Sequence, residues 1–240
     1  MATLYKELST CSSLCSVKVP LSSQKFRLTG RERWRLKKWY NVIAPEYFGS
    51  VVIATTPADE PWKLLGRKIE TTLYDLTGDI TQVHVHLYFQ IHKVDGENAY
   101  TIFKGHELAR DYIRSLTRRK SSKVTAILNV TTKDNYLLRV TVMAWTTFRC
   151  NASQKHAIRK ALMERISQIA SQKSFSEFVV GMVFGEYNQE LFNEAKKIFP
   201  LRKVEIAKSK LLAVPTPEGL KKAVIIPRPG MLEAPHGTSL

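Results

Sequence analysis

The chain has 240 residues, 44% of them hydrophobic, so it can bury a sizeable core in one large domain or two small ones. Its formal charge of +16, from 37 Lys and Arg against 21 Asp and Glu, exceeds any folding requirement and indicates a polyanionic partner such as nucleic acid. Three cysteines give no disulfide framework and favour a reducing, cytoplasmic location, and no apolar run approaches the ~20 residues of a membrane helix.

The positive charge is unevenly distributed along the chain. Residues 1–40 hold 9 bases and 2 acids, residues 41–100 hold 4 and 8, and residues 101–150 hold 10 and 3. An acidic block between two basic ones predicts a folded body with one face turned away from the anion. Charge scattered over the surface for solubility is the simpler alternative.

The densest positive charge lies at residues 31–38, RERWRLKK. Residues 1–30 are rich in Ser and Thr without a period, which predicts an extended or disordered segment. In an extended chain the arginines of residues 31–38 would share one side. We therefore predict an extended basic N-terminal segment over residues 1–37 that contacts phosphates. The candidate contact residues are Arg31, Arg33, Arg35, Lys37 and Lys38.

Two tryptophans lie in or beside this segment. Trp34 and Trp39 could each stack on an unpaired base. For Trp39 we favour packing in the core, because an apolar strand follows it. For Trp34 both interpretations stay open.

Residues 38–150 predict a mainly antiparallel β core with one helix. An apolar stretch at 39–44 and the β-branched stretch SVVIAT at 50–55 predict two strands, the second of them buried. Residues 80–91 alternate apolar and polar side chains and give the clearest strand. Asp95-Gly96 then predicts a hairpin to a returning strand at 99–103. Residues 123–132 and 136–147 predict a second hairpin.

The helix of this core is predicted at residues 105–117. Leu108, Tyr112 and Leu116 are spaced four apart and form its apolar stripe. Arginines at the same spacing form a basic ridge beside the stripe, and a basic loop follows. The candidate RNA-binding residues here are Arg110, Arg114, Arg118, Arg119, Lys120 and Lys123.

Residues 151–212 predict a helical portion that packs on the core and ends in a strand. A helix capped by Ser153 runs to about residue 172, and further helices are predicted at 175–183 and 188–199, before a strand at 204–212. The first helix adds three candidate RNA-binding residues, Lys155, Arg159 and Lys160. Five prolines after residue 213 predict a Pro-rich tail over 213–240.

Catalytic and metal sites have little support. His84 and His86 could hold a metal from one strand face, with His92 further along, but a solvated polar row is the simpler interpretation. Asp75 and Asp79 lie in a turn-rich stretch without a supporting motif. The sequence contains no phosphate loop and no dinucleotide fingerprint. We therefore predict no cofactor, no metal and no enzymatic activity.

Six short stretches occur in a characteristic order. They are 38–45 (KWYNVIAP) followed by Phe48, 66–76 (GRKIETTLYDL), 103–111 (FKGHELARD), 131–139 (TTKDNYLLR), 158–160 and 198–201. Together they span residues 38–212 and resemble the archaeal and eukaryotic eS1 (S3Ae) family of small-subunit ribosomal proteins. The form is similar to the archaeal one, since a long Lys-rich N-terminal tail is lacking. Residues 1–28 and the tail after Val214 match nothing in the family.

The resemblance implies an α+β fold: an antiparallel, partly barrel-like sheet, then packed helices and a final strand. It implies a non-enzymatic, ribosome-bound protein on the platform of the small subunit, near the mRNA exit and the 3′ end of the rRNA. Its implied partners are small-subunit rRNA, neighbouring ribosomal proteins and mRNA near the exit, with no membrane and no DNA. Arg110, Arg159 and Lys160 match family motifs, which supports them as RNA contacts.

Two other functions stay open at this point. A free-standing RNA chaperone or translational regulator would share the positive charge but would not co-sediment with small subunits. A metal-dependent RNA-processing enzyme would use His84, His86 and an Asp, and would lose activity in His84→Ala.

Overall fold

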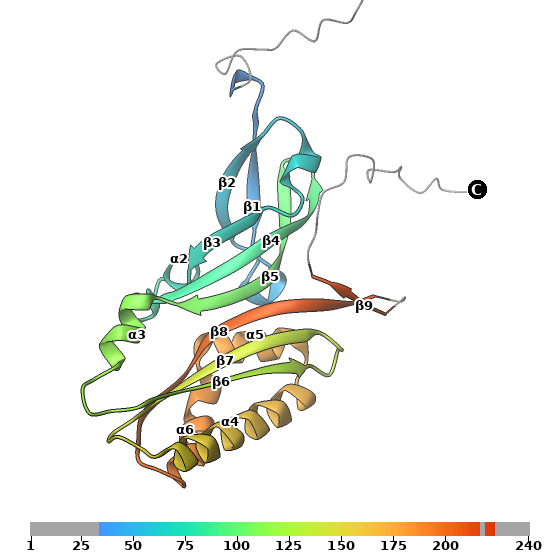
Figure 1. Ribbon diagram of the computed structural model, residues 1–240. Helices are drawn as coiled ribbons and strands as arrows, with labels where there is room; N and C mark the ends of the chain where they lie inside the picture. Colours follow the sequence, from blue (N-terminus) through green and yellow to red (C-terminus); the bar gives the residue numbers. More distant parts are fainter. Residues whose placement is uncertain (1–33, 217–218, 224–240) are drawn as a thin grey trace, which may run out of the picture. The chain divides into compact units, whose positions relative to one another are not determined.

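Two long strands, β5 and β8, connect the parts of a nine-stranded sheet (Figure 1). The computed structural model describes residues 34–216 and 219–223. A short N-terminal unit ends at Leu36, and the body that starts at Lys37 is described by itself. Its elements are β1 (Lys38–Ile43), η1 (Glu46–Phe48), β2 (Val52–Ala58), η2 (Pro61–Leu64), β3 (Lys68–Thr72), α2 (Leu73–Thr77), η3 (Ile80–Gln82), β4 (Val85–Asp95), β5 (Asn98–Leu108), α3 (Arg110–Leu116), β6 (Lys123–Thr131), β7 (Leu137–Thr146), α4 (Ala152–Gln172), α5 (Phe175–Phe184), α6 (Glu186–Lys196), β8 (Leu201–Thr216) and β9 (Gly219–Lys222).

The sheet branches at β5. One edge of β5 pairs with β4 along the whole strand, and β3 continues beyond β4. The other edge pairs in parallel with β1 at residues 98–100 and in antiparallel with β8 at residues 105–107. From β8 the sheet continues to β7 and ends at β6, while β2 ends the branch that begins with β1. Among the described strands β2 and β6 do not pair, so the sheet is not closed and the expected partly barrel-like form is wrong.

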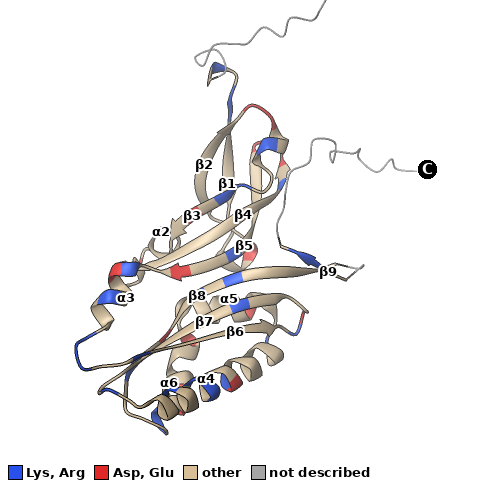
Figure 2. Ribbon diagram, in the orientation of Figure 1, with Lys and Arg blue, Asp and Glu red and all other residues tan. Residues whose placement is uncertain are grey.

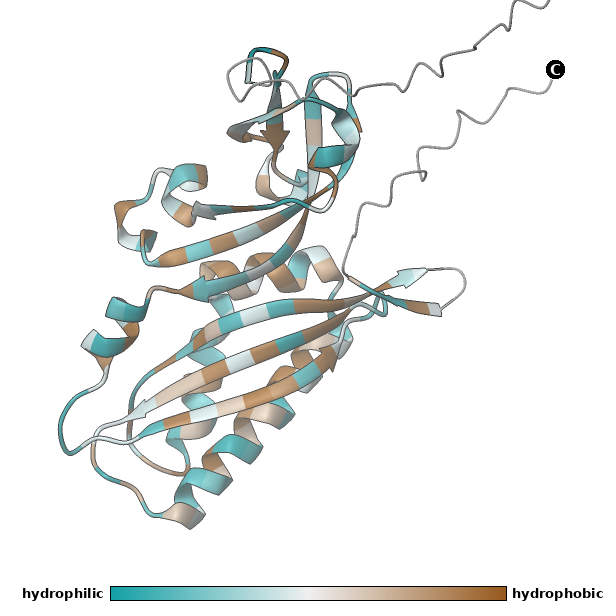
Figure 3. Cartoon of the chain, turned by 45° about the horizontal axis from the view of Figure 1, so that its top comes forward, coloured by the Kyte–Doolittle hydropathy of each residue, from teal (hydrophilic) through white to brown (hydrophobic). Residues whose placement is uncertain are grey.

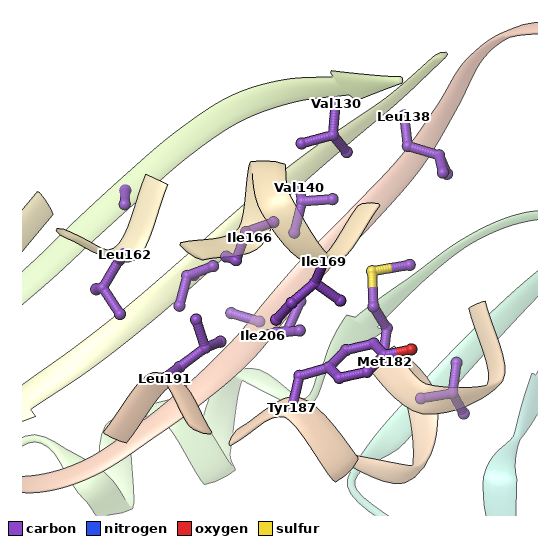
Figure 4. Packing of buried hydrophobic residues seen from close by; sticks show 14 of the residues in the cluster. Val130, Leu138, Val140, Leu162, Ile166, Ile169, Met182, Tyr187, Leu191 and Ile206 are labelled. Atoms are coloured by element: carbon purple, nitrogen blue, oxygen red, sulfur yellow. The ribbon is translucent and has the colours of Figure 1, made fainter. Parts of the chain in front are cut away.

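Three helices cover one face of β6, β7 and β8. The buried stripe of α4, formed by Ile158, Leu162, Ile166 and Ile169, packs against inward residues of these strands (Figure 4). Figure 3 shows hydrophobic and hydrophilic residues alternating along the strands, as expected where one face is buried and the other is not. The predicted helices of this region are confirmed, although Asn151 rather than Ser153 is the N-cap of α4.

A second, smaller core lies between β1, β2 and the far end of β4. It contains Tyr40, Val42, Ala58, Leu64, Ile91 and Ala99. Because Tyr40 and Val42 point inward, the intervening and preceding residues of β1 point outward. Trp39 is therefore 59% exposed, and the interpretation that it packs in the core is wrong. Strand β2 is an edge strand, and its Val52 is 55% exposed rather than buried as expected.

The helix expected at residues 105–117 is shorter than predicted. Gly105 to Leu108 continue β5, because they pair with β4 on one side and, at residues 105–107, with β8 on the other. The helix α3 begins at Arg110 and ends at Leu116, so Arg118 lies beyond it and does not complete a helical ridge. The strand expected from residue 80 also begins later, since Ile80–Gln82 form a 3-10 turn before β4.

The last strand is longer than the predicted 204–212. β8 runs through Thr216, and β9 pairs back on it with Ala213 opposite Lys222. Cys150 is buried as a free thiol. The expectations for residues 1–30, which include Cys11 and Cys15, and for the tail after residue 223 lie outside the described residues.

Candidate nucleic-acid interface

Helix α3 is held in place by a polar network on its inner side. The Tyr112 hydroxyl donates to Glu205 Oε1 at 2.6 Å, and Lys203 Nζ donates to the Tyr112 oxygen at 2.6 Å. The His84 ring stacks on the Tyr112 ring with centroids 3.8 Å apart. Burial raises the pKa of Tyr112, and the Glu205 carboxylate raises it further. These contacts fix α3 against β8 and the turn that precedes β4, and they leave Arg110 and Arg114 exposed.

The basic loop after α3 lies beside the segment that precedes α4. Ser122 ends this loop and is buried, and its hydroxyl accepts a hydrogen bond from the Cys150 amide at 3.3 Å. Strand β6 then begins at the exposed Lys123. On the first turns of α4, Arg159 Nε donates to the Thr125 carbonyl of β6 at 3.2 Å. Arg159 therefore lies against the edge strand rather than projecting freely.

These contacts bring one group of the predicted RNA-binding residues together. We call it the basic strip, and it runs from α3 through the loop to the start of β6 and the first turns of α4 (Figure 2). Its members are Arg110, Arg114, Arg118, Arg119, Lys120, Lys123, Lys155, Arg159 and Lys160. All except Lys155 and Arg159, which are half-buried, are exposed. Lys160 also pairs with Glu164 at 3.9 Å.

Two other predicted residues of the body, Lys37 and Lys38, do not join this strip. Lys37 and Lys38 lie at β1, which pairs with the first residues of β5, whereas α3 follows the last residue of β5. The 11 residues of β5 span about 35 Å at ~3.3 Å per residue. Arg35 is exposed in the separate N-terminal unit. Arg31 and Arg33 lie outside the described residues.

A second cationic cluster was not predicted from the sequence. Lys68 of β3, Lys104 of β5, Lys210 of β8 and Lys222 of β9 line a hollow of about 390 Å³ on the sheet. Lys104 is only 7% exposed. One signal was present in the sequence, since Lys104 directly follows the apolar pair Ile102 and Phe103.

The model of the Ribosomal S3Ae family matches residues 27–215. The chain belongs to the Ribosomal S3Ae family. Among curated relatives named small ribosomal subunit protein eS1, that of Ignicoccus hospitalis is 57% identical over 201 residues, 83% of this chain and 95% of the relative. That of Staphylothermus marinus is 59% identical over 196 residues, which cover 82% of this chain and 92% of the relative. That of Aeropyrum pernix is 58% identical over 200 residues, which cover 82% of this chain and 94% of the relative.

Membership of the S3Ae family agrees with the expectation that the chain is not an enzyme, since the family consists of ribosomal proteins. The histidines proposed as alternative metal ligands have other contacts: His84 stacks on Tyr112, and His86 Nδ1 lies 3.3 Å from Glu70 Oε1. Asp75 is the N3 residue of the capping box of α2, and its hydrogen bond from the Thr72 amide lowers the pKa of the carboxyl. In the described part of the chain, His, Cys, Asp and Glu form no group that could hold a metal ion.

The S3Ae match does not extend over the whole chain, and residues 1–26 and 216–240 lie outside it. The resemblance found in the sequence, which runs from residue 38 to residue 212, is therefore confirmed and slightly extended. Within residues 34–216 and 219–223, no helix has both the length and the apolar character needed to cross a bilayer.

Proposed function

We propose that this chain is a structural constituent of the small ribosomal subunit and binds rRNA through the basic strip. The observation that carries the proposal is S3Ae family membership together with the cations that α3, the loop after it, the start of β6 and the first turns of α4 contribute to one strip. The relatives are named as small-subunit proteins, and the match covers 95% and 92% of the length of two of them. The N-terminal cations from Arg31 to Lys38 are proposed as a second, separate RNA contact.

The mechanism follows from electrostatics. Phosphates of folded RNA repel one another, and a fixed row of Arg and Lys lets them approach by neutralising charge and releasing counterions. Contacts of this kind position a protein on RNA without reading its bases. The arginines of the strip can also fork to a phosphate, which a lysine cannot do.

The location within the subunit rests on the family resemblance alone. We propose that the chain lies on the platform, near the mRNA exit and the 3′ end of the rRNA, in contact with neighbouring ribosomal proteins. Sedimentation of a cell extract on a gradient tests this assignment. A structural constituent co-sediments with small subunits in equal amount, whereas a free-standing chaperone or translational regulator stays mostly near the top.

Neutralising two exposed arginines of the strip tests the RNA contact. In Arg110→Gln/Arg114→Gln we expect weaker binding to small-subunit rRNA, with the slope of log affinity against log salt reduced by about 2 if both residues touch phosphate. The matched control is Lys196→Gln/Lys197→Gln, which removes the same charge from exposed positions at the end of α6. An equal loss in both variants would show that net charge alone drives binding and would refute the strip.

A further inference from the structure

We propose that the lysine-lined hollow on the sheet is a further binding site, which holds phosphate groups of an RNA backbone. It lies between β3, β5, β8 and β9 and uses Lys68, Lys104, Lys210 and Lys222. We call it the lysine trough. The choice of RNA as the source of the phosphate rests on the proposed function, whereas the anion chemistry of the trough does not.

The trough is part of a larger depression on the protein surface. The hollow of about 390 Å³ adjoins two others, of about 260 and 250 Å³, that share residues with it. All three hollows are lined by Lys104. The apolar wall of the largest is formed by Leu137 and residues 211–213. Figure 2 shows Lys or Arg on β3, β5, β8 and β9 in this part of the sheet.

A β-bulge explains how Lys104 reaches the trough. Along the pair of β4 and β5, Tyr88 lies opposite Gly105 while Phe89 lies opposite Phe103, so Lys104 is the extra residue between them. A bulge interrupts the alternation of a strand and redirects one side chain. Residues 103–106 are accordingly all buried in succession.

The charge in the trough has no internal counterpart. In the described part of the chain, none of the four lysine side chains has a hydrogen bond or ion pair. Glu107 borders the trough, but its carboxylate binds Lys208 Nζ at 2.7 Å. Glu70 on β3 accepts from the Tyr88 hydroxyl and contacts His86. Both carboxylates near the trough are therefore engaged elsewhere.

Leaving Lys104 without an anion is unfavourable, because it is buried, whereas Lys68, Lys210 and Lys222 are exposed. Burial, and then the charges of Lys68 and Lys210, lower the pKa of Lys104 to about 8. The side chain is still mostly charged at pH 7, so a buried ammonium faces two like charges. Buried charges in proteins are ordinarily paired, and an uncompensated one costs stability. A bound oxyanion would remove this cost, because several oxygens can accept hydrogen bonds from different lysines at once.

The spread of the lysines favours a nucleic-acid backbone over a single carboxylate. β3 and β5 are separated by β4, and β8 is the next strand after β5. With strands about 4.8 Å apart, the three lysines on these strands cover roughly 15 Å. A row of this length fits a chain that carries one charge on every unit. The leucines of the wall can lie against sugar carbons.

The test reads Lys104 directly, in the full-length chain labelled with ¹³C at the lysine ε carbon. The ε-carbon NMR signal of each lysine is followed from pH 6 to 11, alone and with an eight-residue uridine RNA. Because an anion favours the charged ammonium, we expect the pKa of Lys104 to rise on RNA binding by about one unit or more. At pH 9 binding should therefore take up protons. The exposed Lys197, which is paired with Glu194 at 2.8 Å, is the control and should not shift.

The outcomes separate this inference from the proposed function. If the RNA binds but the titration of Lys104 stays unchanged, the trough is refuted and the basic strip is untouched. If inorganic pyrophosphate shifts Lys104 but RNA does not, RNA is refuted as the source of the phosphate. If neither ligand shifts Lys104, there is no anion site. If RNA shifts Lys104 while Arg110→Gln/Arg114→Gln behaves like its control, the trough stands and the strip fails.

A variant gives an independent readout. Lys104→Met keeps the length of the side chain and removes its charge, so without RNA its melting temperature should be no lower than that of the parent chain. Its affinity for the uridine RNA should fall about tenfold, as expected for losing one charge-assisted hydrogen bond. Lys197→Met is the matched control. A loss no greater than that of the control would overturn the proposal.

Discussion

At the scale of single residues, His106 illustrates how the junction of β5 and β8 is specified. Its side chain is 1% exposed, and its Nε2 lies 3.2 Å from the Ile206 carbonyl oxygen. A carbonyl only accepts, so Nε2 carries the proton and Nδ1 accepts from the Ser209 hydroxyl at 2.6 Å. The Ser209 oxygen in turn accepts from the His106 amide at 3.1 Å. The neutral imidazole is thus fully hydrogen-bonded, and protonation would disturb the network.

This arrangement predicts a pH dependence of stability. Burial lowers the pKa of His106 to about 4, below its value of about 6.5 in the unfolded chain. The stabilising contribution is therefore complete above pH 6.5 and is lost as the pH falls toward 4. At pH 5 the loss relative to pH 7 should be about 2 kcal/mol. Urea unfolding of the parent chain and of His106→Gln checks this. Equal losses in the two between pH 7 and 5 would contradict the assignment.

At the scale of elements, α3 shows how a seven-residue helix is made rigid. A helix this short is marginal by itself, so its order comes from tertiary contacts. Tyr112 supplies them through Glu205 and Lys203, while the arginines on its exposed side face solvent. The network also matters for Glu205, which is 6% exposed and whose Oε2 has no hydrogen-bond partner in the described part of the chain.

Removing the Tyr112 hydroxyl should loosen α3. In Tyr112→Phe the buried Glu205 loses a donor, and we expect a loss of about 1–3 kcal/mol in the free energy of unfolding. Amide hydrogen exchange should become faster in residues 110–117 and stay unchanged in α4. Tyr74→Phe, at an exposed position of α2, is the control. Exchange in α3 no faster than in this control would show that the hydroxyl is dispensable.

At the scale of the whole molecule, two halves of the sheet meet along three residues of β5. Gly105 lies at this junction, and a Cβ atom there would overlap the Ser209 carbonyl oxygen. The strands can approach only because the side chain is a hydrogen atom. The β5–β8 pairing is therefore the most sensitive link between β1–β5 and the helix-covered strands.

Adding one methyl group at this junction should destabilise the fold. We expect Gly105→Ala to lower the free energy of unfolding by about 2 kcal/mol or more, since backbone must move to admit the methyl group. Gly78→Ala is the comparison. Gly78 has a positive φ of 78° but open space around it, so only backbone strain of about 1 kcal/mol is expected. Urea denaturation at pH 7 measures both, and an equal loss would argue against a steric limit at residue 105.

The sequence predicted those elements whose patterns are local. β4 was predicted because apolar and polar residues alternate along it, and α4 was predicted because its apolar residues recur about once per helical turn. Residues 105–108 were assigned to a helix because Leu108 extends the four-residue spacing of Tyr112 and Leu116. What overrides that spacing is pairing with β8, a hundred residues away. The lysine trough was missed for the same reason, since it depends on a bulge and on strands distant in sequence.

The pairing of β5 with β8 also has a consequence for the newborn chain. His106 meets Ser209, so about a hundred residues must be translated after β5 before its partner exists. At a synthesis rate of ~5–20 residues per second, the edge of β5 stays unpaired with β8 for roughly 5–20 s. An unpaired strand edge can form hydrogen bonds with other chains, and a charged lysine on that edge disfavours such pairing. We therefore expect Lys104 to disfavour such association while β8 has not yet been translated.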